Sequence, residues 1–175
     1  MFFELIIIAL IIGLVTGGRF SRLSQLNFRF IYFIILAYLI QVGIDFGAPR
    51  WDFGGYSYLH NISYLILLFA LIKNRNIPGM QIIIAGTLLN FAVIVLNNGQ
   101  MPVRFDVIPA HMAEFLASGK GGTHGLISGE TLLPFLADIF YIKLPYQHQL
   151  ISIGDILINA GIMALIIKGL RGKTQ

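Results

Sequence analysis

Apolar residues in this chain gather into five long runs separated by polar links, covering residues about 2–17, 28–46, 57–72, 80–97 and 150–167. Each run has, or nearly has, the roughly 20 residues that a helix needs to cross the hydrocarbon core of a bilayer. The pattern therefore predicts an all-α integral membrane protein with about five transmembrane helices, forming a single membrane domain over residues 1–175. The first run carries Glu4 before its apolar core and Arg19 after it. This is the reverse of the charge order in a signal peptide, so we expect the run to be retained as a span.

One link is much longer than the others and holds four of the six prolines. We interpret residues 98–149 as an external cap, because long loops often carry function. The cap is expected to contain a turn at Met101-Pro102, a short amphipathic helix from Pro109 to Ser118 and a glycine-rich break at 119–125. A second helix is predicted from about Ser128 to Phe140, with an extended connector over 141–150. This second helix is too short to span, so we expect it to be re-entrant or interfacial.

Lys and Arg near the ends of the runs set the expected orientation, since cytoplasmic loops carry an excess of both. Eight of them flank one set of ends: Arg19, Arg22, Arg29, Lys73, Arg75, Lys168, Arg171 and Lys173. Only four, Arg50, Arg104, Lys120 and Lys143, lie on the opposite side. We therefore expect a plasma-membrane protein with an external amino terminus and a cytoplasmic carboxyl terminus.

The amino acid composition limits which partners and catalytic groups the chain can have. Charged residues make up 11% of the chain, against about 25% in ordinary soluble proteins. The formal charge of +4 reflects scarce acids and does not indicate a nucleic-acid partner. Because the chain has no cysteine, catalytic groups would have to be oxygen or imidazole groups. We expect membrane lipids as neighbours, a peptide or lipid as substrate, and no cofactor.

Polar side chains recur within the runs at spacings that place them on one helical face. In the predicted orientation nearly all of them fall in the outer half of the membrane, which favours a polar pocket open to the outside. The residues that we expect to bind substrate there are Gln41, Asn90, Asn97, Asn98, His124 and Asn159. The alternative is that such side chains only join helices through hydrogen bonds.

Asp155 lies inside the last apolar run, where an ionisable group is costly and is treated as a functional candidate by default. Its structural alternative is specific, because Ser152 and Asp155 have the spacing of a helix-capping box. Asp138 has apolar neighbours on both sides, which would raise the pKa of its carboxyl. A second carboxyl nearby would separate the two pKa values and give one acid and one base. The alternative for Asp138 is an interfacial residue solvated by headgroups.

Histidines offer a base or a metal ligand, and His124 is the most plausible partner of Asp138. No pair of histidines has the i, i+4 spacing of a helical zinc site, so we expect no metal.

Residues 137–161 resemble the end of lipoprotein signal peptidase, in Ala137-Asp138-Ile139 through Pro145 and again from Ser152 to Ile162. In that family one Asp closes a span, an extended stretch follows, and a second Asp opens the last helix. The resemblance implies that Asp138 and Asp155 form a catalytic dyad that cuts a peptide bond at the outer membrane face.

Over nearly its whole length the chain is similar to a bacterial multi-pass membrane family of unknown function. The likeness rests on the segments Asn97–Pro102, Thr123-His124, Glu130-Thr131 and Ser152–Asp155. It implies a fold and no activity.

The leading hypothesis is an aspartyl peptidase-like membrane hydrolase that uses Asp138 and Asp155. The alternatives are a noncatalytic protein that binds or transports a lipid or small solute in the same pocket, and a membrane partner subunit.

Overall fold

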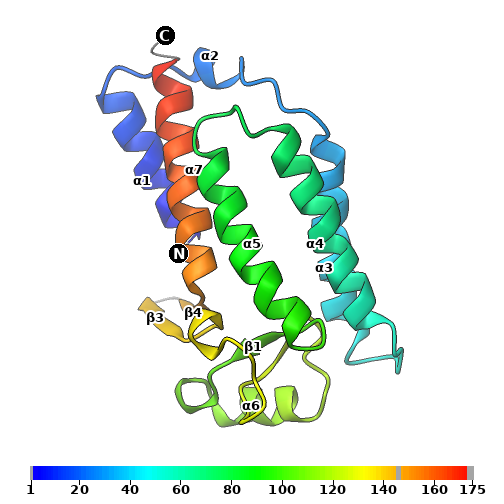
Figure 1. Cartoon of the computed structure of the whole chain (residues 1–175). Coiled ribbons are helices and arrows are strands. Elements are labelled where there is room, and N and C mark those ends of the chain that lie inside the picture. Colours follow the sequence, from blue (N-terminus) through cyan, green and yellow to red (C-terminus); the bar gives the residue numbers. More distant parts are fainter. Residues whose placement is uncertain (1, 145–146, 173–175) are drawn as a thin grey trace.

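Five long helices run up and down between two ends of the molecule (Figure 1). The computed structural model describes residues 2–144 and 147–172. The long helices are α1 (Phe2–Val15), α3 (Ile31–Gly47), α4 (Tyr56–Lys73), α5 (Met80–Leu96) and α7 (Ile153–Arg171). They coincide with the five predicted runs. A short helix, α2 (Phe20–Leu23), links α1 to α3.

By length and composition, α7 is the one helix in the described part of the chain that is long and apolar enough to cross a membrane. Helices α1, α3 and α5 are also apolar but have fewer than 18 residues. The described residues therefore form a mostly helical protein with one candidate span and several shorter apolar helices.

Helices α5 and α7 pack through glycines. A methyl group added at Gly86 would lie 2.4 Å from the carbonyl oxygen of Gly154, and one added at Gly161 would lie 2.8 Å from the carbonyl oxygen of Gly79. Small residues of this kind allow two helix backbones to approach closely without side chains between them. The close approach brings Asn90 of α5 beside the first turn of α7.

Helices α3 and α4 form a second pair. Phe30 and Phe33 stack with their ring centroids 5.9 Å apart, and both meet the edge of Phe69 on α4. Further along, Gln41 donates a hydrogen bond to Ser63 Oγ at 3.0 Å. The pair is thus joined by aromatic rings at one end and by a polar contact toward the other.

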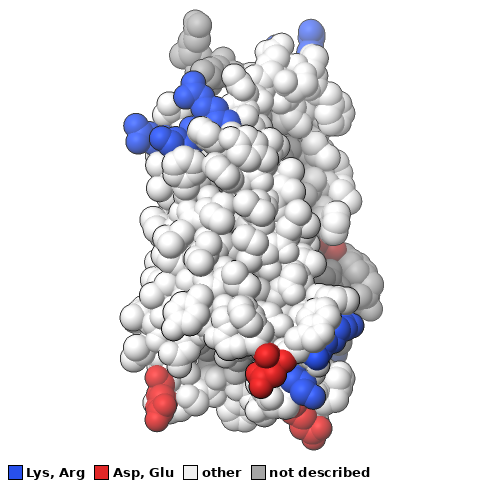
Figure 2. Space-filling view, turned by 90° about the vertical axis from the view of Figure 1, so that its right-hand side faces the viewer, with Lys and Arg blue, Asp and Glu red and all other residues white. Residues whose placement is uncertain are grey.

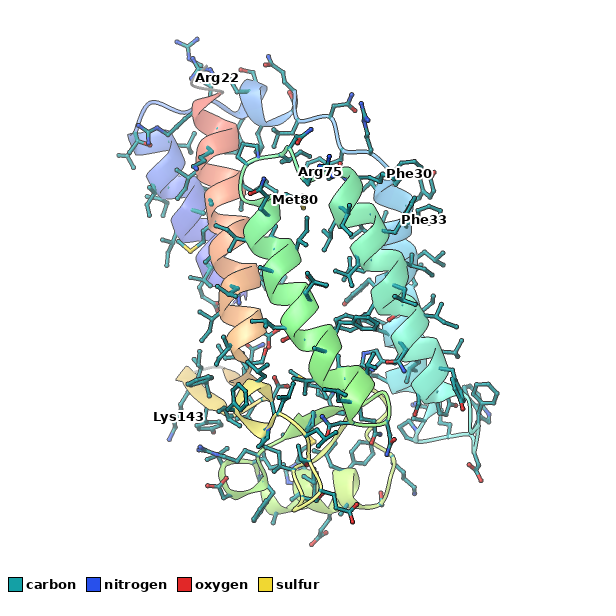
Figure 3. The ribbon with its side chains drawn as sticks, in the orientation of Figure 1. Arg22, Phe30, Phe33, Arg75, Met80 and Lys143 are labelled. Carbon is teal, nitrogen blue, oxygen red and sulfur yellow. The ribbon has the colours of Figure 1, made fainter. Side chains whose placement is uncertain are left out.

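The basic links gather at one end of the molecule. The backbone N–H of Arg19 and the guanidinium of Arg22 donate to carbonyl oxygens at the end of α7, those of Leu170 and Arg171. Figure 3 shows Arg22 and Arg75 at this end and Lys143 at the other. On the face drawn in Figure 2, Asp and Glu lie toward the opposite end together with some Lys and Arg, and a broad, mostly uncharged belt separates the two ends. The described basic residues Arg19, Arg22 and Arg75 therefore share one end of the bundle.

A small cap closes the end opposite the basic links. Strand β1 (Met101–Val103) pairs in parallel with β2 (His124–Leu126), and α6 (Ala110–Ala117) lies between them in the chain. Strands β3 (Phe140–Leu144) and β4 (Gln147–Ile151) pair antiparallel and lead into α7. The predicted short helix over 109–118 and the extended connector over 141–150 are thus confirmed for the described residues.

The predicted helix from Ser128 to Phe140 is wrong. Only a 3-10 turn forms, over Pro134–Leu136, after Leu133 adopts a left-handed backbone with φ +53°. Proline cannot continue a helix that precedes it, and an extended backbone follows the turn. That backbone pairs with β1, because the N–H of Asp138 donates to the Pro102 carbonyl at 3.0 Å. The predicted turn at Met101-Pro102 is also wrong, because these residues form strand β1.

Large apolar side chains lie exposed along the outer faces of the helices. Ile7, Leu39 and Leu65 are 56%, 58% and 55% exposed. These three residues come from α1, α3 and α4, so the apolar surface extends around the molecule. Soluble monomers rarely expose contiguous apolar patches of more than a few hundred Å².

The Gly86→Ala variant tests the packing of α5 on α7. Its methyl group would meet the Gly154 carbonyl and the Ile158 backbone, which cannot move without separating the helices. We expect a loss of about 1–3 kcal/mol in the free energy of unfolding, as is typical of overpacking. Gly43→Ala on α3 is the control, because nothing lies within 4 Å of its added methyl group. Thermal unfolding in detergent measures both, and equal midpoints for the two variants would contradict the packing described here.

Candidate functional site

A polar chamber of about 280 Å³ lies where the bundle meets the cap. Its walls come from α3, α4, α5, α7 and the cap, so residues far apart in sequence converge there. The polar residues that line it are Tyr38, Gln41, Asp45, His60, Tyr64, Asn90, Thr123, His124, Asp138 and Asp155.

Asp155 is held by a closed set of hydrogen bonds at the start of α7. Its Oδ2 accepts from the Ser152 backbone N–H at 3.0 Å, while Ser152 Oγ accepts from the Asp155 N–H at 3.0 Å. Asn90 Nδ2 donates to Asp155 Oδ1 at 2.8 Å, and Ser152 Oγ donates to Asn90 Oδ1 at 2.8 Å. The capping box proposed as the structural role of Asp155 is therefore present. The same carboxylate also lines the chamber.

Asp138 is fixed through its backbone, and part of its side chain has no partner. Its N–H donates to the Pro102 carbonyl, and its own carbonyl accepts from the Arg104 N–H at 3.1 Å. The residue is 6% exposed, and its Oδ1 is buried without a hydrogen-bond partner. The carboxyls of Asp138 and Asp155 are therefore not hydrogen-bonded to each other.

Burial raises the pKa of the Asp138 carboxyl to about 8, and the negative charge of Asp155 adds to the effect. A carboxyl with this pKa is mostly neutral at pH 7 and carries a proton that it can donate. Asp155, in contrast, acts only as an acceptor in the contacts above, which suits the carboxylate form. The two acids thus differ in environment, as an acid and a base in one site must.

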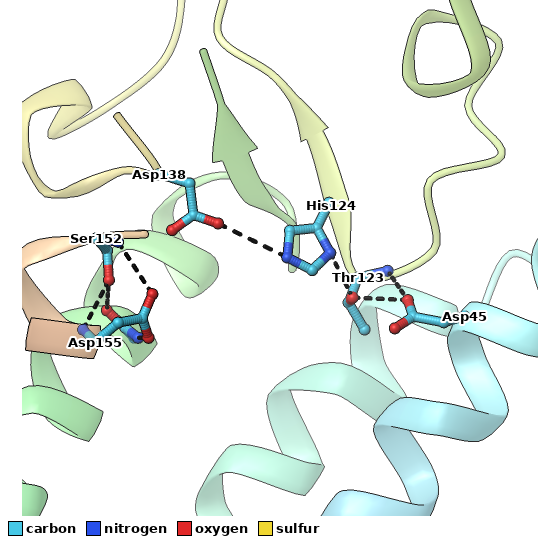
Figure 4. Close-up of polar contacts among 7 residues, drawn as sticks. Asp45, Thr123, His124, Asp138, Ser152 and Asp155 are labelled. Atoms are coloured by element: carbon cyan, nitrogen blue, oxygen red, sulfur yellow. Dashed lines mark hydrogen bonds and ion pairs between the residues drawn. The ribbon is translucent and has the colours of Figure 1, made fainter. Parts of the chain in front are cut away.

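A hydrogen-bonded chain runs from the opposite wall to His124, which faces Asp138 (Figure 4). Asp45 Oδ1 accepts from the N–H of Thr123 at 3.0 Å and from its hydroxyl at 2.7 Å. The Thr123 hydroxyl lies 2.8 Å from His124 Nδ1, and His124 Nε2 lies 3.8 Å from Asp138 Oδ2. The hydrogen bonds therefore link Asp45 on α3 to His124, and a gap of 3.8 Å separates His124 from Asp138.

This chain fixes the tautomer of His124. Thr123 has one hydroxyl proton, and it is donated to Asp45, so the contact with His124 requires a proton on Nδ1. Although 45% of the His124 side chain is accessible, desolvation by the surrounding protein lowers its pKa, against the opposing charges of Asp45 and Asp155. The neutral ring then presents the bare Nε2 toward Asp138.

The wall formed by α4 is also hydrogen-bonded. His60 Nδ1 lies 2.7 Å from the carbonyl oxygen of Gly99, and Ser63 Oγ donates to the His60 carbonyl at 2.7 Å. Gly99 has φ +75° and lies against Ser57, so this turn of the cap is seated directly on α4. These contacts connect the cap rigidly to the bundle beside the chamber.

The chamber brings together five of the eight residues expected in the site: Gln41, Asn90, His124, Asp138 and Asp155. Asn97 lies outside it and instead holds the cap, donating to the Leu132 carbonyl and accepting from the Leu132 N–H. Asn98 lines a neighbouring cavity of about 210 Å³ together with Asn97. Asn159 lines an apolar hollow with Leu5 of α1. It lies one turn beyond Asp155, on the part of α7 that meets α1.

Asp138 also departs from the position that the signal peptidase resemblance implies. It does not close a helix but lies in the extended segment that pairs with β1. Asp155 does open the last helix, as implied.

Sequence reasoning assigned no site role to Asp45 or Thr123. Asp45 shares a helical face with Gln41, which was a usable signal. The contact of Thr123 with Asp45 joins residues 78 positions apart, and no spacing rule predicts it. Among the described residues, no group of three or more His, Asp or Glu side chains is arranged to hold a metal ion.

Comparisons with known proteins give a family but no activity. Residues 25–167 match a family of unknown function, DUF5317. An uncharacterized protein of Thermotoga maritima is 26% identical over 176 residues, which cover all of this chain and 95% of that protein. No solved structure matches the chain.

The raised pKa of Asp138 predicts a pH dependence of stability. The carboxyl loses its proton near pH 8 in the folded chain and near its ordinary value of 3.8 when unfolded. Because the folded state then holds a proton that the unfolded chain has lost, the free energy of unfolding falls as pH rises from about 4 through about 8. This stabilising contribution is fully present below pH 4.

The Asp138→Asn variant should lack this part of the pH dependence, because an amide is neutral throughout the range. Thermal unfolding between pH 5 and pH 9 compares it with the natural chain. A decline of equal slope in both proteins would show that Asp138 does not titrate as described.

Proposed function

Since the chain belongs to DUF5317, a family of unknown function, its role has to be argued from the chamber, and we propose that it is a multi-pass membrane hydrolase of the aspartyl peptidase type. The observation that carries the proposal is the pair of carboxyls in one cavity: Asp138, neutral with an unpartnered oxygen, and Asp155, held as an acceptor.

The membrane location is supported by the surface of the bundle. Exposed apolar side chains cover the helices between a basic end and the cap, and the face in Figure 2 is mostly uncharged over this belt. Burying this apolar surface in hydrocarbon removes it from water, which stabilises the protein by roughly 25 cal/mol per Å² of buried area. The five long helices cross the belt in alternating directions and serve as its spans. The basic end faces the cytoplasm under the positive-inside rule, so the amino terminus and the cap lie outside the cell membrane.

The proposed reaction uses a water molecule between the two acids. Asp155 takes a proton from the water as its oxygen attacks the carbonyl carbon of an amide, and Asp138 gives its proton to the carbonyl oxygen. In the second step the C–N bond breaks, the leaving nitrogen takes the proton from Asp155, and a hydroxyl of the intermediate returns a proton to Asp138. Both acids end in their starting forms.

Neighbouring residues position these two acids. Asn90 and Ser152 fix the Asp155 carboxylate through the hydrogen bonds of the capping box and its extension to α5. His124 presents its unprotonated Nε2 toward Asp138, at 3.8 Å from Oδ2. A small rotation of the carboxyl would bring the two groups into hydrogen-bond distance during proton transfer. Gln41 lies on the facing wall, where it is available to orient a substrate.

Replacing either acid tests the proposal. In proteoliposomes containing the full chain and a library of hydrophobic peptides, Asp138→Asn and Asp155→Asn should each lower the rate of cleavage about 10²- to 10⁴-fold, as expected for loss of acid–base catalysis. Mass spectrometry detects the products. Cleavage by the natural chain should also decline above about pH 8, where Asp138 loses its proton.

Asp106→Asn is the matched control, because Asp106 is exposed and does not line the chamber. Its carboxylate pairs with the Arg104 guanidinium, at an N–O distance of 2.9 Å. This variant should cleave at the natural rate. The hydrolase proposal fails if the chamber variants cleave as fast as this control, or if the natural chain cleaves nothing.

One observation favours a second function, noncatalytic binding or transport of a small solute. Both oxygens of Asp155 already accept hydrogen bonds that stabilise the fold, so the residue needs no catalytic role to account for its position. Under this function Asp155→Asn alters solute binding while no cleavage is found with any substrate.

A further inference from the structure

The charges around the chamber define the class of ligand that it accepts. We propose that the group entering the chamber is a cationic nitrogen, such as an alkylammonium, held between Asp45, Asp138 and Asp155. The inference goes beyond the proposed hydrolysis: it concerns a ligand of the chamber and not the peptide that is cleaved, because a cation that displaces the Asp138 proton removes the acid that cleavage requires.

The chamber wall carries negative charge and no cationic side chain. Three carboxyls line it, from α3, the cap and α7, and none of the residues that line it is Lys or Arg. Arg104, which follows β1, pairs with Asp106 instead. In an apolar bundle the field of such carboxylates is weakly screened and draws a cation in.

Asp45 and Asp155 have hydrogen-bond donors, but no Lys or Arg lies beside them among the residues that line the chamber. Asp45 accepts from the backbone and hydroxyl of Thr123, and Asp155 accepts from Asn90 and the Ser152 backbone. All of these donors are neutral. Asp45 is exposed and Asp155 is half-buried, so a ligand in the chamber can reach both carboxyls. A bound cation would give them a charged partner.

Asp138 gives an independent indication. It is 6% exposed, and its Oδ1 is buried without a hydrogen-bond partner. In Figure 4 one carboxyl oxygen is directed toward His124 and the other toward the side of Asp155. An ammonium group offers three N–H donors and satisfies this oxygen, whereas an anion has none to give.

The geometry favours an organic cation over a metal ion. Within the described residues no three acidic or imidazole groups are spaced to coordinate a metal. A volume of about 280 Å³ lies just below the usual range for small-molecule pockets, which suits a short amine rather than a bulky head group.

Binding should release a proton. A positive charge beside Asp138 lowers the pKa of its carboxyl, so an ammonium that binds near pH 7 displaces the proton that Asp138 holds. The titratable groups that line the chamber with Asp138 are Tyr38, Asp45, His60, Tyr64, His124 and Asp155, and Lys120 lines the adjoining cavity that Asp138 also borders. With His124 in its neutral form, Asp138 is the group expected to give up this proton.

Three probes of similar size and different charge test the proposal: butylammonium, butanol and butyrate. Calorimetry on the full chain in detergent measures their binding at pH 7 in two buffers of different ionisation enthalpy. We expect butylammonium to bind at least about tenfold more tightly than the other two, with release of up to about one proton. Its affinity should rise as pH approaches 8. Equal binding of butanol, or tighter binding of butyrate, would overturn the inference.

Variants add a second comparison. Asp138→Asn should abolish proton release and weaken butylammonium binding about tenfold, while Asp106→Asn should change neither. Unchanged proton release in Asp138→Asn would also overturn the inference. Binding of butylammonium without any peptide cleavage would remove the hydrolase and leave the cation site. Cleavage without a preference for butylammonium would remove the cation site and leave the hydrolase.

Discussion

The hydrogen bonds that join Asn90 to Asp155 and Ser152 determine how the last helix meets the rest of the bundle. They lie where the glycines of α5 and α7 bring the two backbones together. A methyl group at Gly154 would overlap the Asn90 side chain, at 1.9 Å from its Oδ1. Close packing and polar contact therefore depend on each other, and the position of the Asp155 carboxylate follows from both.

The chamber follows from this constraint and from the seating of the cap. The cap contacts the bundle through Thr123 on Asp45 and through Gly99 on His60, and its β1 strand holds Asp138 by backbone hydrogen bonds. Because backbone contacts fix Asp138, its carboxyl can remain buried without a full set of partners. The cost of that burial appears as a raised pKa, and a neutral acid is then available beside a carboxylate.

The sequence predicted the bundle well, because apolar runs and basic links are local signals. The boundaries of α3 and α4 lie within a few residues of the runs 28–46 and 57–72. The Ser152–Asp155 capping box was also predicted, since it depends on a spacing of three residues. The cap was predicted less well. Residues 128–140 are apolar enough for a helix, but Leu133 and Pro134 interrupt it, and pairing with β1 extends the chain around Asp138. Local pattern cannot report a parallel pairing with a distant strand.

The site residues divide in the same way, into those that a local pattern predicts and those that depend on contacts between distant segments. Gln41 and Asn90 were predicted because polar residues on one helical face point toward a shared interior. Asn159 satisfied the same rule and yet faces an apolar hollow, because the rule does not say which neighbouring helix a face meets. The contact of Asp45 with Thr123 depends on the folded cap and was beyond any spacing argument.

The chemistry proposed for the chamber depends on a proton that Asp138 holds at neutral pH in the folded protein. Carbon-13 NMR of aspartate-labelled chain in lipid nanodiscs measures this directly, with the Asp138 carboxyl assigned by its loss in Asp138→Asn. This carboxyl is expected to titrate with a pKa of about 8. A carboxyl that titrates near pH 4, the ordinary range for aspartate, would contradict it.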